Sequence, residues 1–109
     1  MDINETLAVV TGAGSGIGRA LACRLVAAGA RFVVCTDIDA DAARETANLI
    51  GSKASAEILD VADQAAIEDL VKRVESAHGG IDIFVSNAGY ARGGGLKLDT
   101  DQWRDMMEV

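Results

Sequence analysis

Short apolar runs alternate with segments of helical periodicity along the sequence, and this alternation constrains the fold more than any other feature. Apolar strands that are separated by helices are typical of a parallel sheet buried on both faces. Right-handed crossovers then reduce the possible topologies to a doubly wound α/β sheet. Four runs are predicted to be strands: Leu7–Thr11, Arg31–Thr36, Ala54–Leu59 and Ile81–Ser86.

The segments between these runs place apolar residues three or four positions apart, as an amphipathic helix does. The predicted helices are Ile17–Ala28, Ala40–Ile50 and Asp63–Ala77. After the fourth strand, a loop holds Gly93, Gly94 and Gly95. A further helix is expected to begin at Thr100, a good N-cap residue, and to continue to Val109.

Charge and composition exclude several classes of function. Ten lysine and arginine residues stand against 17 aspartate and glutamate residues, and an acidic protein is a poor partner for nucleic acid. The apolar runs are too short to span a membrane, and the acidic N-terminus does not resemble a signal peptide. Cys23 and Cys35 match no metal-binding spacing, so we expect two reduced thiols in a cytoplasmic protein with no bound metal.

The first predicted strand leads into the segment Thr11-Gly12-Ala13-Gly14-Ser15-Gly16-Ile17-Gly18, and a predicted helix follows. Glycines at such a turn allow a tight bend and a close approach of backbone to a pyrophosphate. The helix N-terminus favours an anion there. A Walker A loop is excluded because no Gly-Lys-Ser/Thr follows. An ordinary βα turn and the turn of a methyltransferase that binds S-adenosylmethionine both remain open.

Asp37 follows the second predicted strand and lies 19 residues beyond Gly18. This spacing is close to that of the acid that meets the adenosine ribose in dinucleotide-binding folds. Its carboxylate would accept hydrogen bonds from the ribose hydroxyls and repel a 2′-phosphate, which favours NAD over NADP. Alternatively, Asp37 caps the next helix, although Asp39 and Asp41 can also supply that cap.

Two further motifs narrow the choice: Asp60-Val61 after the third strand and Asn87-Ala88-Gly89 after the fourth. With the Thr-Gly-x-x-x-Gly-Ile-Gly turn, they make the sequence from about Leu7 to Val109 resemble the short-chain dehydrogenase/reductase family. This resemblance argues against the methyltransferase. It implies a single Rossmann-type domain over residues 1–109, with strand order 3-2-1-4.

The resemblance also implies a site for NAD. The glycine turn would line the pyrophosphate, Asp37 and Ile38 would meet the adenosine ribose, and Asp60 and Val61 would meet the adenine. Asn87, Ala88 and Gly89 would contact ribose and stabilise the sheet, and Val109 would approach the nicotinamide ribose. The predicted cofactor-binding residues are Gly12, Ser15, Gly16, Ile17, Gly18, Asp37, Ile38, Asp60, Val61, Asn87, Ala88 and Gly89.

The family's catalytic Asn, Ser and Tyr-x-x-x-Lys are expected beyond Val109, because the one tyrosine, Tyr90, is followed four residues later by Gly94. We therefore expect an NAD-dependent oxidoreductase for a small alcohol or carbonyl substrate, present as its cofactor-binding portion and inactive alone. The alternative is a non-catalytic dinucleotide-binding module or a vestigial fragment. A sheet truncated after Ile81–Ser86 would expose an apolar edge, which predicts self-association into a homo-oligomer.

Overall fold

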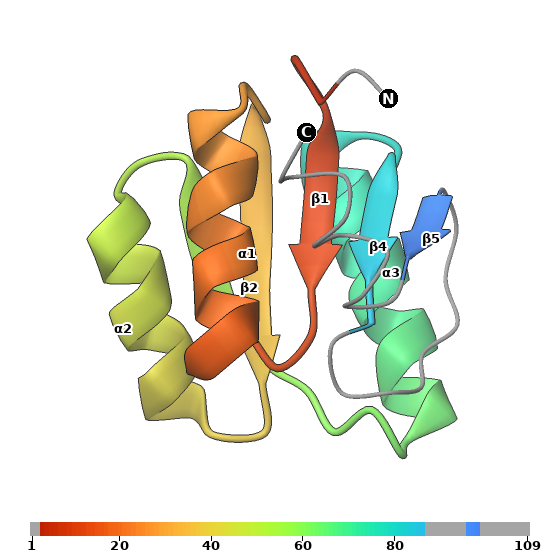
Figure 1. Cartoon of the computed structure of the whole chain (residues 1–109). Helices are drawn as coiled ribbons and strands as arrows, with labels where there is room; N and C mark the ends of the chain where they lie inside the picture. Colours follow the sequence, from red (N-terminus) through yellow and green to blue (C-terminus); the bar gives the residue numbers. More distant parts are fainter. Residues whose placement is uncertain (1–2, 87–95, 99–109) are drawn as a thin grey trace.

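The computed structural model describes residues 3–86 and 96–98, and these form one parallel sheet with helices on both faces (Figure 1). The strand order is β3-β2-β1-β4-β5. This confirms the predicted doubly wound sheet and its 3-2-1-4 order. The strands are β1 (Leu7–Val10), β2 (Phe32–Asp37), β3 (Ala54–Ile58), β4 (Ile83–Val85) and β5 (Leu96–Leu98), and the helices are α1 (Gly16–Ala27), α2 (Ala40–Ile50) and α3 (Gln64–His78).

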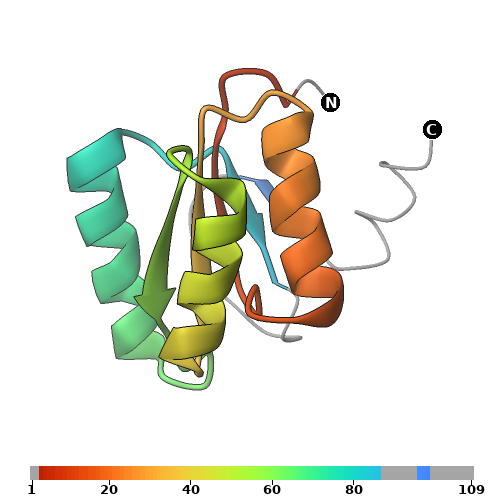
Figure 2. The same ribbon diagram turned by 90° about the vertical axis from the view of Figure 1, so that its left-hand side faces the viewer.

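The sheet lies between two helical layers, with α1 and α2 on one face and α3 on the other (Figure 2). Successive residues of a strand point to opposite faces, and both faces of β1 are fully buried. On one side, Ala8 and Val10 pack with Leu25 of α1. On the other, Leu7 and Val9 pack with Leu70 of α3. Two buried faces explain why β1, β2 and β4 are almost continuously apolar.

β5 corrects one prediction. Leu96–Leu98 pairs in parallel with β4, and Ile83 is the register partner of Leu96. The expectation that the fourth strand forms an exposed edge was therefore wrong, and self-association through that edge loses its structural argument. Three residues after a glycine-rich run are too few to give a strand signal in the sequence. The expected glycine loop at Gly93–Gly95 and the helix from Thr100 lie outside the described residues.

The helices begin and end within a residue of the predicted positions. Asp39 and Asp63 cap α2 and α3, because their carboxylates accept hydrogen bonds from the N–H groups of Ala42 and Ala66, both at 3.1 Å. Gly51 and Gly79 follow these two helices with φ of 100° and 95°. This left-handed region suits glycine and ends a helix.

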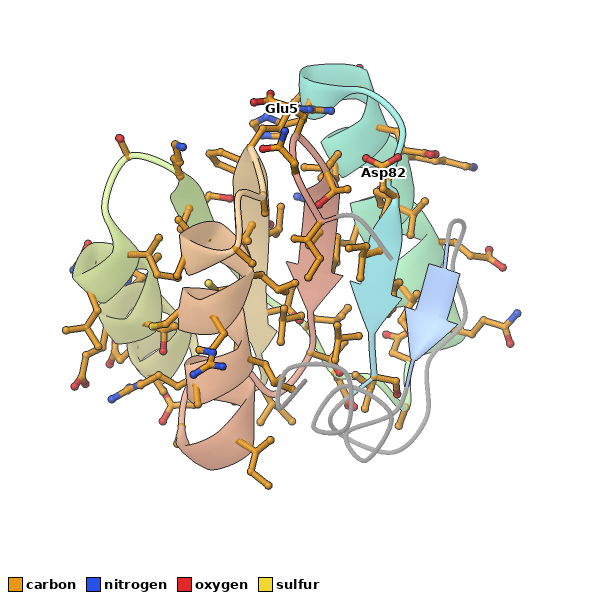
Figure 3. The ribbon with its side chains drawn as sticks, turned by 45° about the horizontal axis from the view of Figure 1, so that its top comes forward. Glu5 and Asp82 are labelled. Carbon is orange, nitrogen blue, oxygen red and sulfur yellow. The ribbon has the colours of Figure 1, made fainter. Side chains whose placement is uncertain are left out.

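The amino ends of β1 and β4 are tied together. The Leu7 N–H donates to a carboxylate oxygen of Asp82, and the Asp82 N–H donates to the Leu7 carbonyl, each at 2.9 Å. Figure 3 shows Glu5 and Asp82 at this end of the molecule. The glycine turn lies at the opposite end of the sheet (Figure 1). In the described part of the chain, none of the helices has the length and apolar character needed to cross a membrane.

Candidate functional site

The carboxyl ends of β1, β2, β3 and β4 meet at one edge of the sheet, where open α/β sheets bind their ligands. Backbone hydrogen bonds fix the glycine turn there: Thr11 N–H donates to the Val85 carbonyl at 3.0 Å, and Ala13 N–H donates to the Thr36 carbonyl at 2.9 Å. The turn after β1 is thus attached to the ends of both neighbouring strands.

Two glycines of the turn have backbone conformations that other residues adopt only with strain. Gly12 has φ of 62° and Gly16 has φ of 56°. Gly16 is exposed, and a Cβ atom there would meet nothing within 4 Å. Gly16 is therefore needed for its conformation and leaves open space beside the first turn of α1. Gly18 is buried on α1.

The N-terminus of α1 differs from those of α2 and α3. Ser15 occupies the N-cap position with an extended backbone, but its side chain makes no capping hydrogen bond, whereas Asp39 and Asp63 cap α2 and α3. Ser15 and Gly16 are exposed, as is Ile17 at 47%. Uncapped N–H groups and the positive end of the helix dipole make this turn suited to an anion.

Asp37 ends β2 and holds two backbone N–H groups. One carboxylate oxygen accepts from Gly14 at 2.8 Å, and the other accepts from Asp39 at 3.0 Å. Because Asp39 caps α2, the alternative in which Asp37 is the helix cap is excluded. Asp37 is half-buried and a carboxylate has about four acceptor positions, so it retains capacity for a ligand.

Gly14 was not among the predicted ligand residues, although it belongs to the glycine turn. A Cβ atom at this position would lie 2.6 Å from Cβ of Ala42 and 2.7 Å from Oδ2 of Asp37. These separations are below van der Waals contact. Glycine at this position therefore lets the turn lie directly against α2 and the Asp37 carboxylate.

Arg19 and Thr46 also contact the turn, and nothing in the sequence pattern singles them out. The Arg19 guanidinium donates to the Gly14 carbonyl and, through Nε, to Oγ1 of Thr46 at 2.9 Å. The buried Thr46 hydroxyl donates to the Ala13 carbonyl at 2.7 Å. Only a spatial contact between α1 and α2 could identify these two residues.

The predicted adenine-binding residues follow β3. Ile58 is the register partner of Asp37, and Leu59 N–H donates to the Asp37 carbonyl at 2.9 Å, so Asp60 lies close to the end of β2. Asp60 is exposed and accepts from the Ala62 N–H at 2.9 Å. Ile38 is 67% exposed, whereas Val61 packs partly against the core beneath α3.

Asn87, Ala88 and Gly89 lie outside the described residues, as does Val109. Ser86, directly before them, is buried at the end of β4, and its hydroxyl has no hydrogen-bond partner within residues 3–86 and 96–98. A buried hydroxyl without a partner costs free energy. A polar ligand group beside Ser86 would relieve that cost. An anionic group would also be stabilised by the uncapped first turn of α1. This edge of the sheet therefore fits a polar, anionic ligand.

The two cysteines take no part in this site. Both are free thiols, and Cys35 is fully buried in β2. Burial, and to a lesser degree the neighbouring Cys23, raises the pKa of the Cys35 thiol to about 12. A thiol that stays protonated is a poor nucleophile and metal ligand. Within the described ranges, no group of three or more His, Cys, Asp or Glu residues could hold a metal ion.

A strand-turn-helix with left-handed glycines, an uncapped anion-binding helix and an acid at the end of the second strand together define a dinucleotide-binding fold. Residues 6–109 match the short chain dehydrogenase family. The chain therefore belongs to the short-chain dehydrogenase/reductase family, which confirms the predicted resemblance.

Relatives of known sequence and structure agree with this assignment. The chain is 37% identical over 110 residues to the 3-oxoacyl-[acyl-carrier-protein] reductase FabG of Salmonella typhimurium, covering 100% of this chain and 45% of that protein. It is 46% identical over 88 residues to the galactitol 2-dehydrogenase of Agrobacterium fabrum, covering 81% of this chain and 34% of that protein. The chain thus spans less than half the length of these relatives.

Two solved structures resemble the fold closely. The hydroxysteroid dehydrogenase from Escherichia coli has a TM-score of 0.74 and 37% identity, over 81% of this chain and 38% of the other. The 3-ketoacyl-(acyl-carrier-protein) reductase from Brucella melitensis, complexed with NADH, has a TM-score of 0.74 and 38% identity, over 80% of this chain and 36% of the other.

Proposed function

We propose that this chain is the NAD-binding portion of a short-chain dehydrogenase/reductase that oxidises an alcohol or reduces a carbonyl compound. The proposal rests mainly on the position of the Asp37 carboxylate. Its carboxylate ends β2, is held by the N–H groups of Gly14 and Asp39, and is not used as a helix cap. The NADH complex of the related Brucella melitensis reductase supports a nicotinamide dinucleotide as the ligand.

Each part of the carboxyl edge has one role in this proposal. The first turn of α1, with Ser15, Gly16 and Ile17, holds the pyrophosphate through N–H groups and the helix dipole. Asp37 accepts hydrogen bonds from the adenosine ribose hydroxyls. Asp60, Val61 and Ile38 border the adenosine, and Asn87, Ala88 and Gly89 complete the site. The bound nicotinamide supplies the hydride chemistry.

The preference for NAD over NADP follows from charge. A 2′-phosphate beside Asp37 would place two anions within hydrogen-bonding distance, which disfavours NADP. Arg19 is a basic side chain that contacts the same turn, but its guanidinium donates to the Gly14 carbonyl, to Thr46 and to Glu45. It is therefore held in place for the turn rather than directed at a second phosphate.

Substitution of Asp37 tests this proposal. Asp37→Asn keeps one acceptor oxygen but removes the charge, and we expect NAD binding to weaken by about 10- to 100-fold, since a hydrogen bond to a charged group contributes roughly 1.5–3 kcal/mol. Binding of NADP should change far less. Calorimetric titration of both dinucleotides measures the two constants.

Asp63→Asn is a matched control, because Asp63 caps α3 and asparagine caps helices equally well. It should leave both constants unchanged. Equal losses of NAD and NADP affinity in Asp37→Asn would contradict the ribose assignment. Tighter binding of S-adenosylmethionine than of NAD by the unaltered chain would contradict the dinucleotide proposal itself.

The catalytic step needs a proton donor or acceptor at the substrate oxygen. In residues 1–109 the single tyrosine, Tyr90, has Gly94 and no lysine four positions later. We therefore expect the isolated polypeptide of these residues to bind NAD without reducing it in the presence of secondary alcohols. The absorbance of the reduced nicotinamide measures this. Turnover by the homogeneous polypeptide would contradict this part of the proposal. We also propose that the protein is cytoplasmic and that it assembles as a homo-oligomer.

A further inference from the structure

We propose that Arg19 and Thr46 are positioning residues that fix the orientation of two successive peptide groups in the glycine turn, one for the ribose side of the ligand and one for the pyrophosphate. The inference rests on the proposed NAD-binding function. Neither residue is directed at the ligand. Both act on main-chain carbonyls, and both come from helices that cover the same face of the sheet (Figure 2).

Thr46 fixes the peptide group between Ala13 and Gly14. In a trans peptide, the carbonyl of one residue and the N–H of the next point in opposite directions. The Thr46 hydroxyl donates to the Ala13 carbonyl at 2.7 Å. The Gly14 N–H therefore points away from α2's Thr46 and donates to Oδ2 of Asp37 at 2.8 Å. Thr46 thus orients the N–H group that holds the ribose-binding carboxylate.

Arg19 fixes the next peptide group, between Gly14 and Ser15. Its guanidinium donates to the Gly14 carbonyl, so the Ser15 N–H points to the opposite side. Ser15 is the N-cap residue of α1 and its side chain makes no capping hydrogen bond, so this peptide group belongs to the helix end where the pyrophosphate would bind. Arg19 also joins Thr46, whose hydroxyl accepts from its Nε at 2.9 Å. The two side chains therefore form one connected support beneath the turn.

The burial of these residues agrees with a positioning role. Thr46 is fully buried, and 28% of the Arg19 side chain is exposed. By contrast, the ion pair between Arg19 and Glu45, at 3.3 Å, involves a carboxylate side chain that is 67% exposed. Exposed ion pairs contribute little to stability. The hydrogen bonds to the Ala13 and Gly14 carbonyls therefore hold the turn, and the ion pair does not. A substitution of Glu45 can then serve as a control.

The experiment compares ligands that do and do not carry a pyrophosphate. Arg19→Met keeps the apolar stem of the side chain and removes its donors. We expect it to weaken NAD binding about tenfold in calorimetric titration, while the dissociation constant for adenosine, measured by NMR titration, changes less than twofold. Arg19→Lys, which retains a donor, should recover part of the NAD affinity. Glu45→Gln and Arg44→Met should bind both ligands as the unaltered chain does.

Thr46 is tested by amide hydrogen exchange in the ligand-free chain. Thr46→Val has nearly the same shape but lacks the hydroxyl, and we expect exchange of the Gly14 amide to accelerate at least tenfold because its contact with Asp37 loosens. Thr46→Ser should restore protection. This measurement needs no ligand and reports on one amide, so a general loss of stability, which would accelerate many amides together, is distinguishable from it.

The outcomes separate the two proposals. Normal NAD binding by Arg19→Met, or equal losses for NAD and adenosine, would overturn the role of Arg19. Unchanged or uniformly accelerated exchange in Thr46→Val would overturn the role of Thr46. Failure of the unaltered, folded chain to bind NAD would refute the proposed function and the pyrophosphate role of Arg19 with it, whereas the Gly14 exchange would still decide the role of Thr46.

Discussion

Replacing Gly14 by alanine should damage both the stability of the chain and its nucleotide site. The added Cβ would lie 2.6 Å from Cβ of Ala42 and 2.7 Å from Oδ2 of Asp37. Neither neighbour can move easily. Ala42 is in the first turn of α2, and its N–H is held by the Asp39 cap. Asp37 is fixed by two backbone N–H groups. The glycine turn and α2 must therefore separate.

The magnitude follows from these contacts. Forcing an extra carbon into a packed site typically costs about 1–3 kcal/mol. Separation of the turn from Asp37 also weakens a charge-assisted hydrogen bond, so we expect a loss near the upper end, about 3 kcal/mol. For a domain of this size, each kcal/mol corresponds to roughly 4–8 °C in the melting temperature. NAD affinity should fall as well, because the displaced carboxylate is the proposed ribose ligand.

Two other glycines supply controls for the assay, which is urea denaturation followed by circular dichroism. Gly80 has no atom within 4 Å of an added Cβ, so Gly80→Ala should change the free energy of unfolding by less than about 0.5 kcal/mol. Gly16 also has open space but φ of 56°, and its alanine variant should lose about 1–2 kcal/mol from backbone strain. A Gly14→Ala variant as stable as Gly80→Ala, with unchanged NAD affinity, would refute the packing argument.

Further predictions concern the helix caps and the buried thiol. Asp39→Ala and Asp63→Ala should each lower the free energy of unfolding by about 1 kcal/mol, because each removes the cap of its helix. Only Asp39→Ala should also weaken NAD binding, since Asp39 adjoins Asp37, and equal NAD binding by the two variants would contradict that link. The Cys35 thiol has a pKa of about 12 in the folded chain against 9.0 ordinarily, so the folded state binds its proton more tightly than the unfolded state does. This contribution to stability is complete below pH 9 and declines by about 1.4 kcal/mol per pH unit between pH 9 and 12. Denaturation curves measured from pH 8 to 11 should therefore fall less steeply with pH for Cys35→Ala, and parallel pH dependences would count against the burial argument.

The sheet was predictable from the sequence because burial on both faces leaves a direct signal. Val33, Val34 and Cys35 form a continuous apolar run, and all three are buried in β2. The first turn was equally visible, since Gly12 and Gly16 adopt left-handed conformations that favour glycine. Asp37 was placed correctly at the end of β2 by its spacing from the glycine turn.

The residues that the sequence did not reveal depend on contacts between distant segments. Arg19 and Thr46 meet across two helices, 27 residues apart, and neither belongs to a motif. The need for glycine at position 14 arises from Ala42 rather than from its own backbone angle. β5 was missed for a different reason, because a strand of three residues has too little periodicity to distinguish it from a loop.

The pairing of β1 with β4 has a consequence for how the chain folds. Leu7 and Asp82 are separated by 75 residues, and Thr11 and Val85 by 74. A ribosome adds roughly 5–20 residues per second. About 4–15 s therefore pass between the synthesis of β1 and that of β4, which pairs with its second edge. β2 can pair with β1 much earlier, since Leu7 meets Phe32. The base of the glycine turn, anchored through Thr11 to Val85, is therefore completed late during synthesis, after both helices on its own face of the sheet have been made.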